Sequence, residues 1–196
     1  MSVNTTRTRT LIAAVATAVL AVGGLTACGT DDEPTKESKP SSSSEEKTGG
    51  ETKDGDKKGE EKSDESGAYA AGDTAVYDSG LKITVSAAEG YTPDEYAVGH
   101  TEGNTAHKVT VTLENTGDEN VSADLITVSA RAGEDGVDAE EIFDNTVGSG
   151  FSGELLPGKK ATAVYAFDAP ADAKVLDLEV ELIDFTTAPA QWSLQL

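Results

Sequence analysis

Apolar and polar residues alternate repeatedly after residue 68, with the period of two expected of strands that bury one face. No segment there carries an apolar stripe with the 3.6-residue period of a helix. Eight segments show or suggest the alternation: Leu81–Val85, Val109–Leu113, Leu176–Leu182, Ala161–Phe167, Trp192–Leu196, Thr74–Tyr77, Leu125–Ala130 and Glu140–Phe143. The pattern therefore predicts an all-β domain of seven to eight strands.

Turn-forming residues separate these segments. Asp78-Ser79-Gly80 favours a tight hairpin between the strands Thr74–Tyr77 and Leu81–Val85. Asn115-Thr116-Gly117-Asp118 is a turn that ends the strand Val109–Leu113. Pro157-Gly158 has the residues required at the two central positions of a type II turn. Strands with one buried and one solvated face, joined by such turns, predict an antiparallel two-sheet β-sandwich over residues 68–196.

The first 27 residues have the three parts of a signal peptide. Arg7 and Arg9 precede the apolar run Leu11–Leu20, and small residues follow it up to Ala27. Glycine, alanine and threonine dilute the apolar run, so a cleaved signal is favoured over a retained membrane span. Cleavage is expected between Ala27 and Cys28.

Leu25-Thr26-Ala27-Cys28 resembles the lipoprotein box of bacteria. The resemblance implies that Cys28 is acylated, by palmitate or a similar chain, and becomes the first residue of a lipid-anchored protein on the extracellular face of the cell membrane. The alternative is an ordinary signal peptide that leaves Cys28 as a free thiol.

Residues 28–67 form a predicted linker. From Gly29 to Gly67 the chain has seven lysines and thirteen acidic residues, and no aliphatic or aromatic side chain. Such a segment cannot offset the conformational entropy lost on folding, so it is expected to be disordered. A spacer of about 35 Å between anchor and domain is the favoured role, and a tail that binds a basic partner is the alternative.

Charge and cysteine content exclude several classes of protein. The formal net charge is −21, which opposes binding to nucleic-acid phosphates and to anionic lipids. Membrane attachment therefore needs the lipid. The single cysteine cannot form an internal disulfide or a cysteine-based metal cluster.

No recognisable catalytic, cofactor-binding or metal-binding set emerges from the remaining motifs. Gly148–Gly153 has the spacing G-x-G-x-x-G, but Pro157-Gly158 leaves no room for the helix that a dinucleotide site needs, so a loop is predicted. His100 and His107 lie in a polar stretch, and exposed loop histidines are favoured over a metal pair or a catalytic base.

Carboxylate pairs are frequent in this acidic chain, and they offer two weaker hypotheses. The pairs are Asp94/Glu95, Asp118/Glu119, Glu134/Asp135 and Glu140/Glu141. Two carboxylates are the machinery of glycan hydrolysis. The run Glu134–Glu141 has oxygen ligands around a glycine, which suits Ca²⁺, although the spacing is not that of an EF-hand. A solvated acidic loop is favoured.

Tyr91 and Tyr96 flank a short polar segment that is predicted to be a loop. Tyrosines on loops are effective contact residues for a protein partner. The favoured role is to cover one end of the sandwich, and contact with a partner is the alternative.

The domain resembles a known family in the order of its motifs. Gly72–Val76 opens the domain, Lys108–Gly117 is a strand ending in an Asn-x-Gly turn, and Leu155–Lys160 leads into Val164–Pro170. This succession resembles the immunoglobulin-like domain of unknown function of lipoproteins from high-GC Gram-positive bacteria. That family is related in fold to a secreted mycobacterial antigen and carries no catalytic residues to transfer.

The sequence as a whole favours a non-enzymatic binding module, tethered to the cell envelope by lipid. Its expected partner is an unidentified envelope protein or cell-wall component, with no nucleic acid and no cofactor. The alternative is a calcium- or carboxylate-dependent hydrolase of cell-wall glycans.

Overall fold

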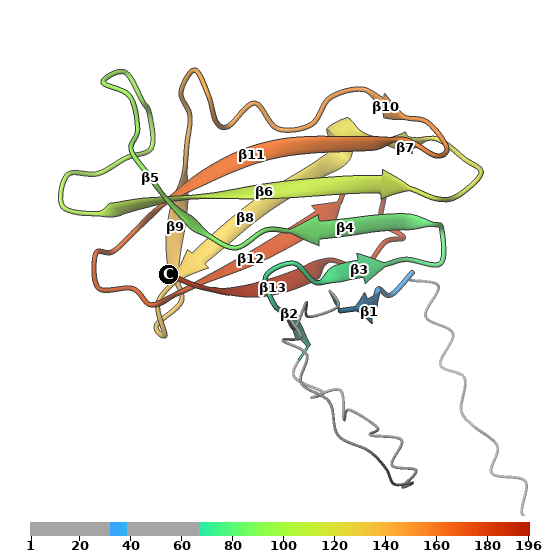
Figure 1. Cartoon of the computed structure of the whole chain (residues 1–196), viewed down its shortest axis with the longest axis horizontal. Helices are drawn as coiled ribbons and strands as arrows, with labels where there is room; N and C mark the ends of the chain where they lie inside the picture. Colours follow the sequence, from blue (N-terminus) through green and yellow to red (C-terminus); the bar gives the residue numbers. More distant parts are fainter. Residues whose placement is uncertain (1–31, 39–66) are drawn as a thin grey trace, which may run out of the picture.

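A computed structural model describes residues 32–38 and 67–196, and the regular secondary structure in this part of the chain is almost entirely β-strand (Figure 1). It contains thirteen strands and one short 3-10 helix, Ala123–Leu125. The strands are β1 (Thr35–Glu37), β2 (Ala68–Tyr69), β3 (Thr74–Val76), β4 (Leu81–Val85), β5 (Glu89–Tyr91), β6 (Thr105–Asn115), β7 (Val121–Ser122), β8 (Ile126–Ala132), β9 (Val137–Ile142), β10 (Glu154–Leu155), β11 (Lys160–Ala169), β12 (Val175–Leu182) and β13 (Ala190–Gln195). Within these two ranges, no helix is long and apolar enough to cross a membrane.

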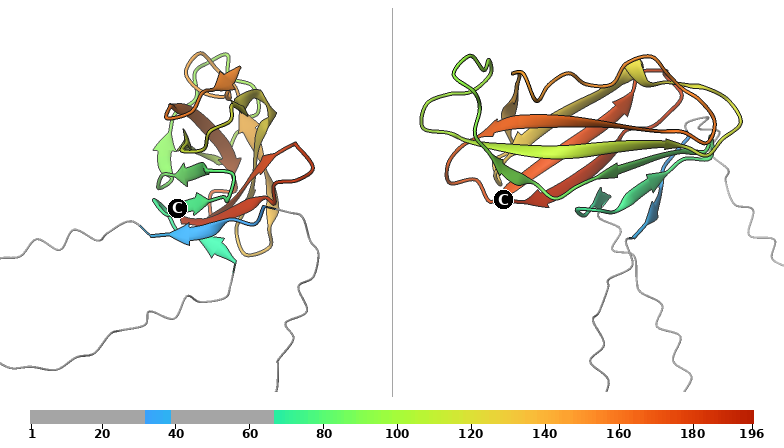
Figure 2. Two further views of the ribbon diagram at one scale, coloured as in Figure 1. Left: turned by 90° about the vertical axis from the view of Figure 1, so that its right-hand side faces the viewer. Right: turned by 45° about the horizontal axis from the view of Figure 1, so that its top comes forward.

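Most strands belong to one sheet that folds over into two facing layers (Figure 2). The strand order is β1-β3-β4-β6-β11-β9-β8-β12-β13-β2, with β5 added to β6. Strand β9 joins the layers, because its end pairs with β11 through Ile142 and Ala166 and its start pairs with β8 through Ala139 and Ala130. Among the named strands, every pairing is antiparallel except β13 with β2. The predicted β-sandwich is confirmed.

The predicted number of strands is wrong. All eight predicted segments form strands, and five short strands, β1, β2, β5, β7 and β10, are added to them. Each of the five has only two or three residues. A segment this short cannot show a period of two, and its pairing partner decides whether it becomes a strand.

The predicted turns are confirmed by their backbone. Gly80 has a φ of +89°, and its N–H donates to the carbonyl of Tyr77 in the hairpin between β3 and β4. Gly158 has a φ of +72°, and the N–H of Lys159 donates to the carbonyl of Leu156 across the turn. A positive φ at the third residue is the requirement of a type II turn, which glycine meets without strain.

The core lies between the two layers and is built from alternate residues of each strand. Trp192, Phe167, Leu113 and Leu178 are among its largest fully buried side chains. The Trp192 ring stacks on Tyr69, with ring centroids 5.0 Å apart, and its indole N–H donates to the backbone at 3.3 Å. Burial of such aromatic side chains, with their polar atoms bonded, is a major source of stability in a domain without a disulfide.

A second, smaller core lies on the outer face of the layer that contains β6, β11 and β9. Its buried members are Ala106, Ile142, Val147 and Ala166. Tyr91, the last residue of β5, and Ala97, in the loop that follows, pack against it. Strand β11 contributes to both cores, because Tyr165 and Phe167 face inward and Ala166 faces outward.

The prediction of a disordered linker is wrong for residues 32–38. Thr35–Glu37 form β1, which pairs with β3 in the register Thr35↔Val76. The prediction considered only apolar burial, whereas this segment is held by backbone hydrogen bonds and by charged side chains. The predicted signal peptide, the cleavage and acylation site at Ala27 and Cys28, and residues 29–31 and 39–66 of the linker lie outside the described residues.

Candidate functional site

Two loops meet at one end of the sandwich and cover the smaller core. One loop follows β5 and the other follows β9 (Figure 1). They are joined by a β-bridge in which Val98 and Phe143 each donate a backbone N–H to the other's carbonyl, both at 2.9 Å. Gly99 has a φ of +92°, and a Cβ there would lie 2.1 Å from the carbonyl oxygen of Glu141. Only glycine allows this close approach of the two loops.

The Asp144 carboxylate organises the second loop and ties it to the first. It accepts hydrogen bonds from the backbone N–H of Thr146 at 2.7 Å and of Val147 at 3.1 Å, and from the hydroxyl of Tyr91. Asn145 adds a bond from its amide to the carboxylate of Asp94 at 2.9 Å. The Tyr91 hydroxyl, followed by the Thr146 N–H, holds the pKa of Asp144 well below its usual range.

Asp168 holds the first loop to the end of β11 in a similar way. Its side chain is buried and lies 2.7 Å from Nδ1 of His100. It also accepts from the side-chain amide of Asn104 at 2.6 Å and from the N–H of Thr101 at 3.3 Å. A buried carboxylate with three partners is satisfied, so this group has a structural role in fixing the loop.

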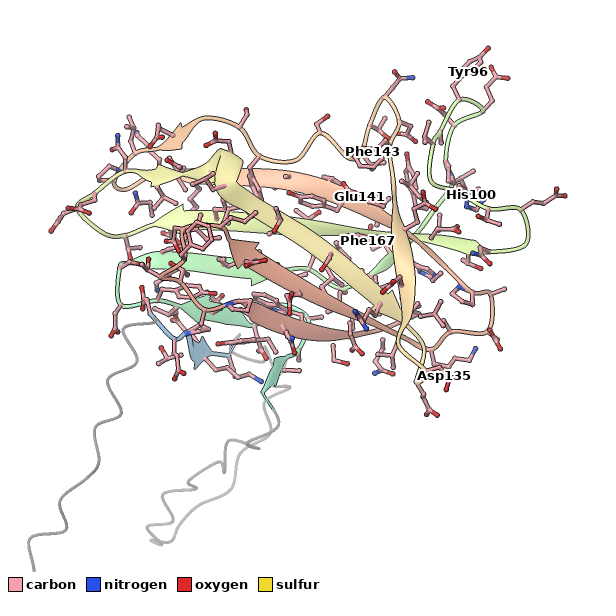
Figure 3. All side chains as sticks on the ribbon, turned by 180° about the vertical axis from the view of Figure 1, so that it is seen from behind. Tyr96, His100, Asp135, Glu141, Phe143 and Phe167 are labelled. Atoms are coloured by element: carbon pink, nitrogen blue, oxygen red, sulfur yellow. The ribbon has the colours of Figure 1, made fainter. Side chains whose placement is uncertain are left out.

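Large apolar side chains are exposed where the two loops meet. Tyr96 is 79% exposed, Val98 67% and Phe143 48%. Figure 3 shows Tyr96 at the far end of the molecule, with Phe143 on the neighbouring loop. We call these three residues the tip surface. Because Asp144 and Asp168 fix the backbone beneath it, the tip surface is presented on an ordered support.

Glu141 lies just beneath the tip surface and faces the interior. It is opposite Phe167 in the pairing of β9 with β11, so both side chains lie on the inner face of the sheet (Figure 3). Burial raises the pKa of Glu141 to about 7. Its neighbour Glu140 points to the opposite face, because successive side chains of a strand alternate. The predicted pair Glu140/Glu141 therefore does not form a two-carboxylate site.

The two predicted tyrosines have different surroundings. Tyr91 is partly buried against the smaller core, and its hydroxyl is bonded to Asp144 and Thr146. Burial, followed by the bond to Asp144, raises the pKa of Tyr91. Tyr96 has only its backbone N–H engaged, by Asp94 at 2.7 Å, and its ring is exposed. Tyr91 thus has the covering role, and the ring of Tyr96 is accessible to a partner.

The two histidines do not share a site. His100 bonds to Asp168 in the loop, whereas His107 is a residue of β6 whose partial burial lowers its pKa. The prediction that both are exposed loop residues is wrong for His107. The glycine-rich segment Gly148–Gly153 is a loop that leads into strand β10, as predicted, and no helix follows it.

The acidic segment Glu134–Glu141 forms the turn between β8 and β9 and then β9 itself. In the part of the chain that the structure describes, no group of three or more His, Cys, Asp or Glu side chains is placed to hold a metal ion. A separate open hollow of about 790 Å³ lies on the outer face of β8, β12 and β13, with Asp177 and Glu179 among its lining residues. Glu179 accepts a hydrogen bond from Gln191 at 2.8 Å.

Sequence reasoning missed Val98, Phe143, Asp144 and Asp168. Asp144-Asn145-Thr146 has the composition of a turn in which the aspartate accepts from the backbone two and three residues on, and this signal was available. The pairing of Val98 with Phe143 joins positions 45 residues apart, so no local pattern indicates it.

Several solved structures are similar to this chain. The candidate lipoprotein ycdA of Bacillus subtilis is 12% identical with a TM-score of 0.48, and the match covers 60% of this chain and 37% of that chain. The yjhA protein of Bacillus subtilis is 18% identical with a TM-score of 0.49, covering 65% of this chain and 99% of that one. MPT63, a secreted protein of Mycobacterium tuberculosis, is 15% identical with a TM-score of 0.40, covering 63% and 84%.

No curated protein matches the chain. The connection with lipoproteins of Gram-positive bacteria stays a prediction. The family described as "Domain of unknown function (DUF4352)" matches residues 69–190, nearly the whole sandwich. The chain therefore belongs to the DUF4352 family.

Proposed function

We propose that this protein is a non-catalytic binding module of the cell envelope, which contacts a partner protein through the tip surface. The observation that carries the proposal is the exposure of Tyr96, Val98 and Phe143 on two loops braced by buried or bonded carboxylates. Exposed apolar side chains gathered at one place on a soluble domain mark interaction sites, and tyrosine and phenylalanine are enriched there.

The braced loops favour binding over catalysis. Asp144, Asp168 and His100 have bonding partners within the domain, so their polar atoms support the loops. An ordered surface loses little conformational entropy when it binds, which strengthens association. The carboxyl of Glu141 faces the inner side of the sheet, and its neighbour Glu140 on β9 points to the opposite face.

Attachment to the outer face of the membrane is the second part of the proposal. It rests on the lipoprotein-like segment Leu25–Cys28 after an apolar signal. Two acyl chains are enough for stable attachment to a bilayer. Cys28→Ser removes the acylation site, so the protein is expected to leave the membrane fraction. A variant that fractionates with the membrane like the native protein contradicts this part.

Site-specific crosslinking in intact cells tests the tip surface. A photoreactive amino acid replaces Tyr96 in one variant and Leu156, which is 50% exposed elsewhere on the domain, in a matched control. We expect position 96 to give a discrete crosslinked product that position 156 does not give. The product should weaken at least several-fold when Val98→Ser and Phe143→Ser are added.

Both serine substitutions are at exposed side chains, so the melting temperature is expected to change little. Crosslinking that is equal from both positions, or unaffected by the two serine substitutions with the fold intact, contradicts the tip surface as the contact. Retained membrane attachment in these variants keeps this test separate from the test of Cys28.

A further inference from the structure

The segment nearest the proposed anchor is fastened to the end of the sandwich opposite the tip surface. The N–H of Asp32 donates to the carbonyl of Thr186 at 2.8 Å, and the N–H of Ala188 donates to the carbonyl of Asp32 at 3.2 Å. The Asp32 carboxylate accepts from the N–H groups of Asp78 at 2.7 Å and Ser79 at 2.9 Å. Figures 1 and 3 show the start of β1 at one end of the molecule and the tip loops at the other.

The rest of the segment adds contacts that keep it in place. Lys36 lies 2.8 Å from the largely buried carboxylate of Asp73. The hydroxyl of Tyr69 donates to the carbonyl of Pro34 at 3.2 Å. Lys36 is also 5.9 Å from the centre of the Tyr69 ring, within range of a cation–π interaction. Residues 32–38 are therefore part of the folded domain.

Only three residues, Gly29, Thr30 and Asp31, separate Cys28 from Asp32. Four fully extended steps span at most about 14 Å. A polar headgroup layer is about 5–8 Å thick on each side of the hydrocarbon core. If Cys28 carries its acyl chains in the membrane, the end of the domain at Asp32 must therefore lie close to the membrane surface.

An exposed aromatic side chain lies at this same end. Phe185 is 94% exposed and has a φ of +64°, the one positive φ of a residue other than glycine in the described ranges. The carboxylate of Asp184 holds its turn, accepting from the N–H groups of Thr186 at 2.9 Å and Thr187 at 2.8 Å. A strained backbone that projects an aromatic ring into solvent is costly, and such strain is concentrated at functional sites.

We infer that the end of the sandwich formed by Asp32 and the turn around Phe185 rests on the outer leaflet of the cell membrane. The Phe185 ring enters the headgroup region, and the tip surface points away from the membrane toward other envelope proteins. This inference rests on the proposed acylation of Cys28. The partner is the bilayer that holds the chain's own anchor, because the short connection allows the domain no greater distance.

The acidic charge of the domain opposes contact with anionic lipids. Asp32 and Asp184 lie at this end, although their carboxylates are bonded to backbone N–H groups. Anionic lipids repel so acidic a protein. The short connection, and not charge attraction, therefore holds the end against the bilayer, and the contact should be closer on zwitterionic than on anionic vesicles.

Depth-dependent fluorescence quenching tests the orientation on the full acylated chain. Acylated Cys28 has no free thiol, so Phe185→Cys provides the single thiol for an environment-sensitive fluorophore. Tyr96→Cys provides the matched control at the tip surface. The proteins are reconstituted in phosphatidylcholine vesicles containing spin-labelled lipid, with and without phosphatidylglycerol. We expect quenching at position 185 to exceed that at position 96 at least several-fold.

A longer connection provides the second test. About twenty Gly and Ser residues, with a root-mean-square span of about 25 Å, are inserted between Thr30 and Asp31. Quenching at position 185 is expected to fall toward that at position 96. Flotation with the vesicles should be unchanged.

Failure of the two proposals is distinguishable. If the native chain does not float with the vesicles, acylation of Cys28 and the orientation both fail. If the chain floats but position 185 is quenched no more than position 96, the orientation alone is overturned. Quenching at 185 that survives the insertion unchanged overturns the role of the short connection.

Discussion

At the scale of single residues, carboxylates decide the shape of the tip. Asp144 gathers donors from its own turn and from Tyr91, and Asp168 gathers His100, Asn104 and a backbone N–H. Hydrogen bonds from the protein replace the water that each carboxylate loses on folding. A carboxylate can be partly or fully buried only when its lost hydration is compensated in this way. The loops therefore have a defined conformation before any partner arrives.

Glu141 differs from these two aspartates, because burial is the dominant influence on its pKa. Burial raises its pKa to about 7 from an ordinary value of 4.5. The folded protein thus favours the protonated form, and the resulting stability is present below pH 4.5 and lost as the pH rises through 7. Glu141→Gln stays neutral at every pH and avoids this loss.

We expect Glu141→Gln to melt like the native protein near pH 4 and several degrees higher at pH 8. The gain is about 1 kcal/mol after allowance for the solvent that reaches this half-buried side chain. Thermal melts at both pH values measure it, and Glu140→Gln, on the opposite face of β9, is the control. A melting difference that does not vary with pH would show that Glu141 titrates as an ordinary glutamate.

At the scale of elements, β1 covers a sheet edge that would otherwise be exposed. Strand β3 pairs with β4 on one side and with β1 on the other. Exposed edge strands invite pairing with a second molecule, and proteins usually protect them. Lys36 and Glu37 place charges on the new edge, where they form ion pairs with Asp73 and Lys82.

Removal of β1 is expected to destabilise the domain and open this edge. We compare a chain that begins at Gly29 with one that begins at Lys39, so that both lack the anchor and differ by residues 29–38. The shorter chain should melt about 3–5 °C lower, equivalent to about 1 kcal/mol for a domain of this size. It should also self-associate in sedimentation experiments. Identical melting and association of the two chains would mean that β1 contributes nothing to the fold.

At the scale of the whole molecule, acidic charge dominates the surface. Residues 68–196 contain six basic and 23 acidic residues, a net charge of −17. The ion pairs of this region, such as Lys160 with Glu114 at 2.9 Å, are exposed and contribute little each. Repulsion among the unpaired carboxylates therefore lowers the stability of the folded state.

Salt should raise the melting temperature by screening that repulsion. The rise is expected to be nearly complete at about 0.15 M NaCl, where the Debye length is about 8 Å, and to be similar for other monovalent salts. At that ionic strength, about 1 mM CaCl₂ and EDTA should give the same melting temperature. A calcium-dependent rise that Asp135→Asn and Asp138→Asn abolish would instead reveal a bound calcium ion.

The sequence by itself determined the class of fold and the position of its long strands. Alternation along Leu81–Val85, Val109–Leu113 and Leu176–Leu182 reports which side chains face the core, because the period of a strand is a local property. Gly80 and Pro157-Gly158 determined their turns for the same reason, since φ is restricted residue by residue. Tyr96 was also indicated, as an aromatic residue in a polar segment.

Only the tertiary structure decided which distant segments meet. Val98 lies beside Phe143, His100 beside Asp168, and Asp32 beside Thr187, and each contact joins residues far apart in the chain. Backbone hydrogen bonds and carboxylates make these contacts, and such groups leave no periodic pattern because any residue can offer an N–H or a carbonyl. For that reason the composition of residues 32–38 predicted a linker, whereas the pairing with β3 makes them a strand of the sandwich.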